Sequence, residues 1–216
     1  MPVFNPAHVQ DYLDLGIIAF GMSRYSGAWV GFKCVTDTVE SSASVSADIK
    51  RIQLQTPTDY ELPAGGLNIR LGLMPTAAES RHLDLRLEAV KAFARANGID
   101  KIIIGGAGRK RLGVVTTGKA TMDVIEALRA LGIDDAQARS LGVAVYKVGM
   151  SWPIEPQGLK AFAADCDEIL VIEEKRPVIE EQLSHLLYNL PADRRPRLTG
   201  KRDLSGAPLV AQTGEL

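Results

Sequence analysis

Three short polar segments of this chain have side chains and spacing that suit ligand binding or acid–base chemistry. In the first, Thr117-Gly118-Lys119 joins an expected strand to the start of an expected helix. Backbone N–H groups and the helix dipole favour negative charge at such a turn, and the lysine adds a cation, so a phosphate or carboxylate is a suitable ligand. The turn lacks the spacing of a nucleotide-binding P-loop. The alternative is an ordinary helix start with a solvated lysine.

The second group is a pair of carboxylates, Glu173 and Glu174, at the end of the apolar run Ile169 to Ile172. Open α/β sheets bind their ligands at the carboxyl ends of the strands. Paired carboxylates there suit acid–base chemistry or the binding of a cation. The alternative is structural, with one glutamate capping the helix that Pro177 begins, or pairing with a neighbouring cation or another subunit.

The third group is a polar stretch that follows the expected strand Trp29 to Val35. Its members are Thr36, Asp37, Thr38, Glu40, Ser41 and Ser42. Their hydroxyls and carboxylates suit contact with a polar substrate or cofactor. The alternative is a polar loop that merely bounds a domain.

The second half of the chain alternates strands with helices. Leu112 to Val115 is the first expected strand, Gly142 to Leu190 supplies two more strands and two helices, and Arg197 to Thr199 adds an edge strand. This alternation predicts an α/β domain with helices on both faces of a mostly parallel sheet, over residues 112–205.

The first half is less regular and predicts a partial α/β segment. A helix is expected from Asn5-Pro6 to about Ser26, because this pair suits a helix start. Its expected core face is Val9, Leu13, Ile17 and Phe20. Residues 50–75 lack periodicity and read as a connecting arm.

A second helix and a basic link complete the first half. The helix is expected to begin with a capping box at Thr76 and to end at Asn97-Gly98. Lys101 to Ile104 is a short apolar run, and residues 105–111, which end in the basic run Arg109 to Arg111, are interpreted as a flexible link. A contact of the basic run with the phosphates of a ligand is an alternative.

Composition excludes several classes of function. The chain has 216 residues and a formal net charge of −1, so bulk charge indicates no nucleic-acid partner. Apolar runs are shorter than the roughly 18 residues that a membrane span needs, so no membrane contact is expected. The start, Met1 to Asn5, does not resemble a signal peptide, and a cytoplasmic location is expected. The two cysteines, Cys34 and Cys166, predict buried free thiols and no iron–sulfur cluster or metal site in this chain.

Long motifs resemble a known family. Three of them resemble the transketolase C-terminal-like domain of thiamine-dependent enzymes: TTGKA at 116–120, YKVGMSWPIEP at 146–156 and ILVIEEKRPVIEEQL at 169–183. The segment SRYSGAWVGFKCVTDTVESSASV at 23–45 is similar to large fused bacterial indolepyruvate:ferredoxin oxidoreductases. The resemblance covers essentially the whole chain.

The resemblance implies a function for a larger protein, here called the parent. Such enzymes oxidatively decarboxylate indolepyruvate or related aryl 2-oxoacids to acyl-CoA and pass the electrons to ferredoxin. They use thiamine diphosphate, magnesium, iron–sulfur clusters and coenzyme A as cosubstrate, and a homodimer is expected. The resemblance also implies that the polar stretch 36–42 lies near the substrate and thiamine pocket.

Departures from the family pattern predict that the chain is an internal fragment. It lacks the GDG motif with the asparagines that hold the magnesium, and it lacks a cysteine cluster. The expected parts are the end of a thiamine pyrimidine-binding domain (1–50), a connecting arm and helix (51–111), the transketolase C-terminal-like domain (112–205) and a linker (206–216). The fragment is then an inactive scaffold without a bound cofactor, whose partner is the rest of the parent. The alternative is a free-standing anion-binding or assembly module of α/β fold.

Overall fold

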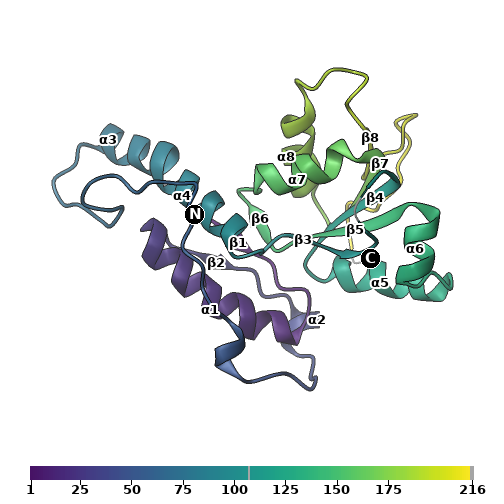
Figure 1. The fold of residues 1–216 in the computed structure, drawn as a ribbon, viewed down its shortest axis with the longest axis horizontal. Helices are drawn as coiled ribbons and strands as arrows, with labels where there is room; N and C mark the ends of the chain where they lie inside the picture. Colours follow the sequence, from purple (N-terminus) through teal and green to yellow (C-terminus); the bar gives the residue numbers. More distant parts are fainter. Residues whose placement is uncertain (107, 215–216) are drawn as a thin grey trace. The chain divides into compact units, whose positions relative to one another are not determined.

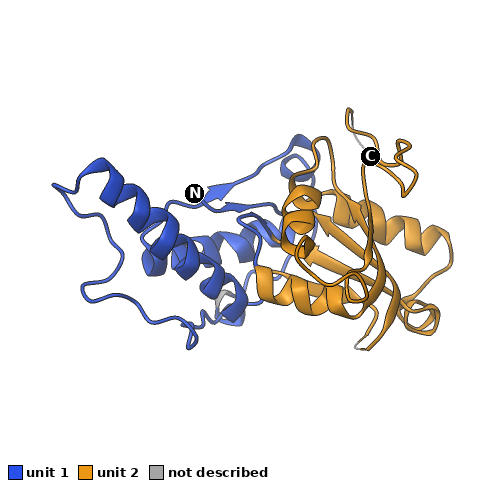
Figure 2. Ribbon diagram, turned by 90° about the horizontal axis from the view of Figure 1, so that it is seen from above, with its two compact units in different colours: residues 1–99, 150–155 blue, residues 100–149, 156–216 orange. Residues whose placement is uncertain are grey.

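The chain divides into two compact units in a computed structural model that describes residues 1–106 and 108–214 (Figures 1 and 2). Unit 1 comprises Met1–Ile99 and Met150–Glu155, and unit 2 comprises Asp100–Gly149 and Pro156–Leu216. Ala107 of the expected link and the last two residues of the expected linker lie outside the described residues.

Unit 2 is built on a five-stranded sheet with the order β3-β5-β4-β7-β8. β3 runs antiparallel to β5, and the other neighbouring pairs are parallel. The mostly parallel sheet predicted from the alternating pattern is therefore confirmed, and β8 is the expected edge strand. The strands are β3 (Lys101–Ile104), β4 (Lys110–Thr117), β5 (Val143–Val148), β7 (Cys166–Ile172) and β8 (Arg197–Thr199).

Helices cover both faces of this sheet (Figure 1). On one face, Val124 of α5 packs against Val114 of β4 and Val145 of β5. On the other, Phe162 of α7 lies against Tyr146 of β5, with ring centroids 5.0 Å apart. Burial of such side chains contributes about 1.5–3 kcal/mol each. The helices of unit 2 are α5 (Ala120–Ala130), α6 (Asp135–Leu141), α7 (Pro156–Ala164) and α8 (Val178–Leu187).

Gly113, in the middle of β4, allows α7 to approach the sheet closely. A Cβ atom at this position would lie 2.7 Å from both Cys166 Sγ and Phe162 Cε1. We expect Gly113→Ala to lower the free energy of unfolding by about 1–3 kcal/mol, because packed neighbours must move. Gly16→Ala is the control, since no heavy atom lies within 4 Å of its added carbon. Urea unfolding followed by circular dichroism measures both; equal stability of the two variants would contradict the close packing.

The short apolar run Lys101–Ile104 is strand β3. The link expected over residues 105–111 is partly structured, which corrects the sequence interpretation, because β4 begins at Lys110, inside the basic run. Lys110 is buried. Its ammonium lies 5.5 Å from the ring centroid of Phe162 and donates a hydrogen bond to the Gly108 carbonyl at 2.7 Å. A long side chain with both contacts belongs to the packed domain rather than to a solvated link.

Unit 1 packs two helices on a small sheet with the order β2-β1-β6. β1 pairs parallel with β2 and antiparallel with β6, which returns to this unit from far along the chain. The elements are β1 (Val3–Phe4), α1 (Val9–Ser26), β2 (Gly31–Phe32), α4 (Leu87–Ala96) and β6 (Met150–Trp152). Their shared core contains Phe4, Leu15, Ile18, Met22, Val90, Phe93 and Met150.

The predicted core face of α1 is wrong. The buried side contains Leu15, Ile18 and Met22, whereas Leu13 and Phe20 are 42% and 74% exposed. The helix also begins later than Asn5-Pro6: His8 is its N-cap and accepts from the Asp11 N–H. Apolar residues surround most of this helix, so periodicity alone did not identify the packed face.

The remaining elements of unit 1 are short. The strand predicted over Trp29 to Val35 is only Gly31–Phe32, and the predicted capping box at Thr76 is absent, because the helix begins at Pro75 without a side-chain cap. The stretch between 52 and 74 has no helix or strand, as the lack of periodicity predicted. The short elements are α2 (Thr36–Val39), η1 (Ile49–Arg51), α3 (Pro75–Ser80) and the π-helix η2 (Arg81–Arg86).

Candidate functional site

The turn after β4 brings Thr117, Gly118 and Lys119 to the carboxyl edge of the unit 2 sheet. Gly118 has φ +56°, a left-handed conformation that favours glycine. Thr117 Oγ1 donates to the Val148 carbonyl at 2.7 Å, which ties the end of β4 to β5. The turn leads directly into α5, whose N-cap is Lys119.

Lys119 forms ion pairs within its own unit. Its Nζ lies 3.1 Å from Asp123 Oδ2 and 3.4 Å from Glu174 Oε1. The hydrogen bond to Asp123 raises the pKa of Lys119, and Glu174 raises it further. The structure thus brings together two groups that the sequence placed apart, the turn and the strand-end carboxylates. An incoming anion would have to displace carboxylates that already neutralise this lysine.

Glu173 caps helix α8. Its side chain is 3% exposed, and its carboxylate accepts hydrogen bonds from the N–H groups of Ile179, at 2.9 and 3.0 Å, and of Glu180, at 2.9 Å. Burial raises the pKa of Glu173, although these backbone hydrogen bonds lower it. The capping arrangement is one of the alternatives that the sequence left open, and it leaves this carboxylate facing its own helix.

Lys201 is a buried cation that the sequence analysis missed. Its Nζ donates to the carbonyl of Glu173 and, at 2.9 Å, to that of Ala211. Burial lowers the pKa of Lys201, against the attraction of Glu173 and Glu180. These hydrogen bonds connect the stretch after β8 to the residue that follows β7. In the sequence, Lys201 stands between a glycine and an arginine in a polar segment. Such a position does not predict a buried side chain.

The polar stretch 36–42 lies in unit 1 and is mostly exposed. Thr38 is buried, and its hydroxyl lies 2.6 Å from the Tyr12 hydroxyl and donates to the Val35 carbonyl at 3.1 Å. Ser41 Oγ donates to the Thr38 carbonyl at 2.9 Å. These bonds fix α2 on α1. The exposed members are Thr36, Asp37, Glu40, Ser41 and Ser42.

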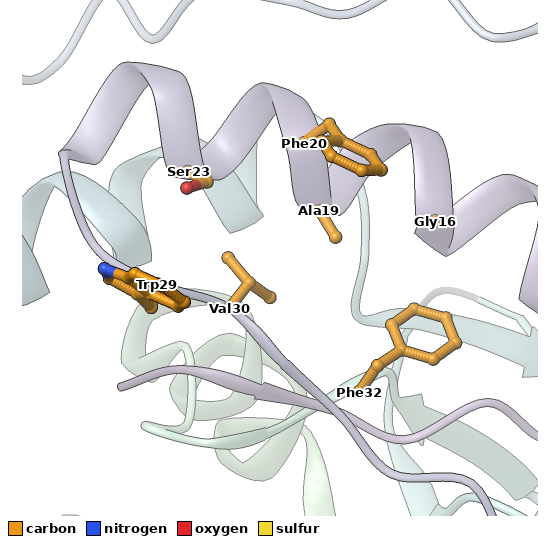
Figure 3. A pocket seen from close by; sticks show the side chains of 7 residues that line it. All are labelled: Gly16, Ala19, Phe20, Ser23, Trp29, Val30 and Phe32. Carbon is orange, nitrogen blue, oxygen red and sulfur yellow. The ribbon is translucent and has the colours of Figure 1, made fainter.

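An apolar groove of about 510 Å³ runs between α1 and the segment that enters β2 (Figure 3). Phe20 and Trp29 contribute large side chains that are 74% and 77% exposed. The sequence analysis assigned Phe20 to the core and so missed this surface. The groove is lined by Gly16, Ala19, Phe20, Ser23, Trp29, Val30 and Phe32.

The two cysteines differ in environment. Cys34 is exposed, which corrects the expectation that it is buried, whereas Cys166 is buried as expected. Burial raises the pKa of the Cys166 thiol to about 11. We expect a thiol-reactive aromatic disulfide at pH 8 to modify Cys34 rapidly. Cys166 should react only after unfolding, because a buried thiol with a high pKa provides little thiolate. Fast modification of both cysteines in the folded chain would contradict this.

Over residues 1–106 and 108–214, no group of three or more histidine, cysteine or acidic side chains is placed to hold a metal ion. In the same part of the chain, no helix is long and apolar enough to span a membrane.

Comparison with known proteins identifies the family. The sequence model described as the indolepyruvate oxidoreductase domain matches residues 101–216, more than half of the chain. The chain belongs to the indolepyruvate oxidoreductase domain family. The resemblance to indolepyruvate oxidoreductases stated in the sequence analysis is thereby confirmed.

Curated relatives of this domain are subunits of larger oxidoreductases. The indolepyruvate oxidoreductase subunit IorA of Pyrococcus abyssi is 26% identical over 189 residues, which cover 85% of this chain and 27% of that protein. The subunit of the same name from Methanothermobacter thermautotrophicus is 26% identical over 185 residues, covering 85% of this chain and 28% of the relative. The chain therefore spans little more than a quarter of the length of these relatives.

Solved structures of related architecture include an oxidoreductase and a transketolase. A 2-oxoglutarate:ferredoxin oxidoreductase from Magnetococcus marinus, with 2-oxoglutarate, coenzyme A and succinyl-CoA bound, aligns with a TM-score of 0.51 and 16% identity, over 97% of this chain and 40% of that one. A split-gene transketolase, an inactive β4 tetramer, aligns with a TM-score of 0.50 and 15% identity, over 96% and 50%. At these identities the likeness shows the fold alone, which is the α/β fold expected from the motifs.

Proposed function

We propose that this indolepyruvate oxidoreductase domain is an internal part of a thiamine diphosphate-dependent 2-oxoacid:ferredoxin oxidoreductase. The parent oxidatively decarboxylates indolepyruvate or related aryl 2-oxoacids to acyl-CoA, with ferredoxin as electron acceptor. Support comes from the family match over residues 101–216 and from the length of the curated relatives, of which this chain covers 27–28%. A homodimeric parent is part of the proposal.

Within the parent, this chain acts as a scaffold and an interface. The observation that supports this role is that the charged side chains at the carboxyl edge of the unit 2 sheet already have partners within the chain. Lys119 pairs with Asp123 and Glu174, and Glu173 caps α8. Side chains committed to such contacts are poor candidates for catalysis, because a reaction would have to release them first.

We assign the parts of the chain to parent domains by their position. Residues 1–50 are assigned to the end of a pyrimidine-binding domain, 51–99 to an arm and helix, and 206–216 to a linker. The transketolase C-terminal-like domain is extended from the expected 112–205 to 100–205, because β3 and the start of β4 belong to the sheet of unit 2. The exposed polar side chains of the stretch 36–42, with Asp37 and Glu40 as its charged members, then face the substrate and thiamine pocket of the assembled parent. Their role is to bound that pocket.

The residues of this chain do not fit a complete magnesium diphosphate site. The described residues offer no group of three or more acidic, histidine or cysteine side chains that could hold the ion, and the sequence lacks the GDG motif with its asparagines. Thiamine diphosphate, magnesium and the iron–sulfur clusters are therefore assigned to portions of the parent outside residues 1–216. The isolated chain is accordingly expected to be inactive.

Calorimetric titration of the isolated chain tests this assignment. Magnesium with thiamine diphosphate, followed by coenzyme A, is expected to give no binding heat. Tight binding of thiamine diphosphate would contradict the fragment proposal. Binding of coenzyme A that Lys119→Ala abolishes would favour the alternative, a free-standing anion-binding module.

A further inference from the structure

Charged side chains gather at the amino edge of the unit 2 sheet, away from the polar groups at its carboxyl edge. β5, β4, β7 and β8 are neighbouring parallel strands, so their amino ends meet at this edge. Lys119 and Glu174 follow the carboxyl ends of β4 and β7 and lie at the opposite edge. Arginines so concentrated suit an anionic partner. Those at or shortly before the amino ends of β4 and β8 are Arg109, Arg111, Arg194, Arg195 and Arg197.

Three hollows of the surface adjoin one another along this edge, and we call them together the amino-edge cleft. Their volumes are about 380, 450 and 330 Å³. Asp167 and Arg197 line both the first and the second, and Arg109 lines both the first and the third. Because neighbouring strands lie about 4.8 Å apart, a cleft that crosses the ends of four strands is about 14 Å long. The charged residues of the first hollow are Arg109, Asp167, Asp193, Arg194, Arg195 and Arg197.

The arginines of the turn before β8 are not committed to carboxylates. Arg194 and Arg195 are exposed, and neither forms an ion pair with another residue in the described part of the chain. Arg195 Nη1 donates to the Tyr188 carbonyl, a neutral acceptor, at 3.3 Å. Pro196 follows them and is buried, so the turn is held against unit 2. The N–H donors of these two guanidinium groups are therefore available to an incoming anion.

The other two arginines of the first hollow form ion pairs that are open to water. Arg109 Nε donates to Asp167 Oδ1 at 2.8 Å, and Arg197 Nη2 lies 3.0 Å from Glu168 Oε2. The side chains of Arg109 and Arg197 are 72% and 62% exposed. Water screens such pairs, so a new carboxylate can share or replace the partner at little cost. Lys119 differs, since its side chain is 19% exposed and two carboxylates hold it.

The mixture of charges in the cleft favours a polypeptide over a compact anion. Guanidinium groups bind carboxylates and phosphates through paired N–H donors. A polyphosphate concentrates its charge, which would place it beside the carboxylates of Asp167, Glu168 and Asp193. In an extended segment, side chains that point the same way are about 6.8 Å apart, so two acidic side chains can reach separate arginines. About four extended residues cover the length of the cleft.

We propose that the amino-edge cleft binds an acidic segment of another protein, in which at least two carboxylates are spaced two residues apart. Arg194 and Arg195 bind the first carboxylate, and Arg109 or Arg197 binds the next. The inference rests on the interface role proposed above and not on the reaction of the parent. The cleft selects the partner by its charge, since the chain as a whole has a net charge of −1 and does not attract an acidic protein by bulk charge.

Fluorescence anisotropy tests the proposal. The chain is titrated into a labelled peptide of alternating glutamate and serine that is about eight residues long, twice the length of the cleft. Saturable binding is expected, and its affinity should fall at least about 10-fold from low to high ionic strength, because exposed charges are screened by salt. A peptide of the same length with lysine in place of glutamate is expected not to bind.

Two matched variants locate the binding. Arg194→Glu and Arg129→Glu change the net charge by the same amount, but Arg129 lies on α5, outside the cleft, with its side chain 77% exposed. Arg194→Glu is expected to weaken peptide binding at least about 10-fold, because a repulsion replaces an attraction at the contact. Arg129→Glu is expected to change it less than about twofold, since salt screens distant charges. Both arginines are exposed, so the circular dichroism of both variants should match that of the unchanged chain.

Three results would overturn the inference. They are the absence of saturable binding, equal affinities of the two variants, and displacement of the labelled peptide by less inorganic pyrophosphate than unlabelled peptide, which would identify a phosphate site. Failure of the proposed function is separate. If the chain binds the peptide but the longer polypeptide reduces no ferredoxin with any aryl 2-oxoacid, the enzyme is contradicted and the cleft is not.

Discussion

Replacement of Glu173 by alanine is expected to lower the free energy of unfolding of unit 2 by about 2 kcal/mol. The change removes the acceptor for the Ile179 and Glu180 N–H groups, and loss of a helix cap costs about 1–2 kcal/mol. It also removes one of the carboxylates whose attraction opposes the lowered pKa of the buried Lys201. Urea unfolding followed by helical circular dichroism measures the loss.

Glu181→Gln is the matched control, because Glu181 is an exposed acidic residue on the same helix. A change within about 0.5 kcal/mol is expected there. Equal losses for Glu173→Ala and Glu181→Gln would show that the cap does not hold α8.

Glu173→Gln separates the charge of this residue from its hydrogen bonds. Burial raises the folded-state pKa of Glu173 above its ordinary value of 4.5, so the folded chain binds this proton more tightly than the unfolded chain does. Its contribution to stability is therefore greatest below about pH 4.5 and falls as the pH rises through the folded-state pKa. The glutamine variant has no such proton and should gain stability relative to the unchanged chain over that window. The opposite trend would contradict the burial effect.

Arg95→Leu is expected to destabilise unit 1 by about 3–5 kcal/mol, because it removes the cation from a buried carboxylate. Arg95 Nη1 donates to Glu155 Oε1 at 2.7 Å, and the Glu155 side chain is 3% exposed. This bond joins α4 to the end of the segment that carries β6. Thermal unfolding monitored by tryptophan fluorescence would report the change, since Trp29 lies in unit 1.

Asp59→Asn provides the comparison for Arg95. Asp59 Oδ2 accepts from Arg95 Nε at 2.8 Å, but its side chain is 47% exposed. Exposed ion pairs contribute about 0–1 kcal/mol. If Asp59→Asn cost as much as Arg95→Leu, burial of Glu155 would not be the source of the stability.

The sequence predicted the strands and helices that are marked by residues within or next to them. The apolar run at Ile169 and the proline at 177 correctly placed β7 and the start of α8, within a few residues. Helix α6 was missed although Asp134 and Gln137 form its capping box, a pattern that is visible in the sequence.

Pairings between distant residues were not predictable in this way. β6 was not predicted as a separate strand, yet it pairs with β1, almost 150 residues earlier in the chain. Strand partners depend on tertiary packing, which a single sequence does not record. The same limit applies to the polar groups: the ion pair of Lys119 with Glu174 joins residues that lie far apart in sequence. The position of each residue at a strand end suggested a ligand site, whereas in the structure Lys119 and Glu174 form an ion pair with each other.

Ferredoxin reduction by the longer polypeptide tests the central claim most directly. The product of the whole reading frame, supplied with magnesium, thiamine diphosphate and coenzyme A, is expected to reduce ferredoxin when indolepyruvate is added. Residues 1–216 alone are expected to give no reduction under the same conditions. Reduction by residues 1–216 alone, or a longer polypeptide that reduces no ferredoxin with indolepyruvate or any other aryl 2-oxoacid, would contradict the account.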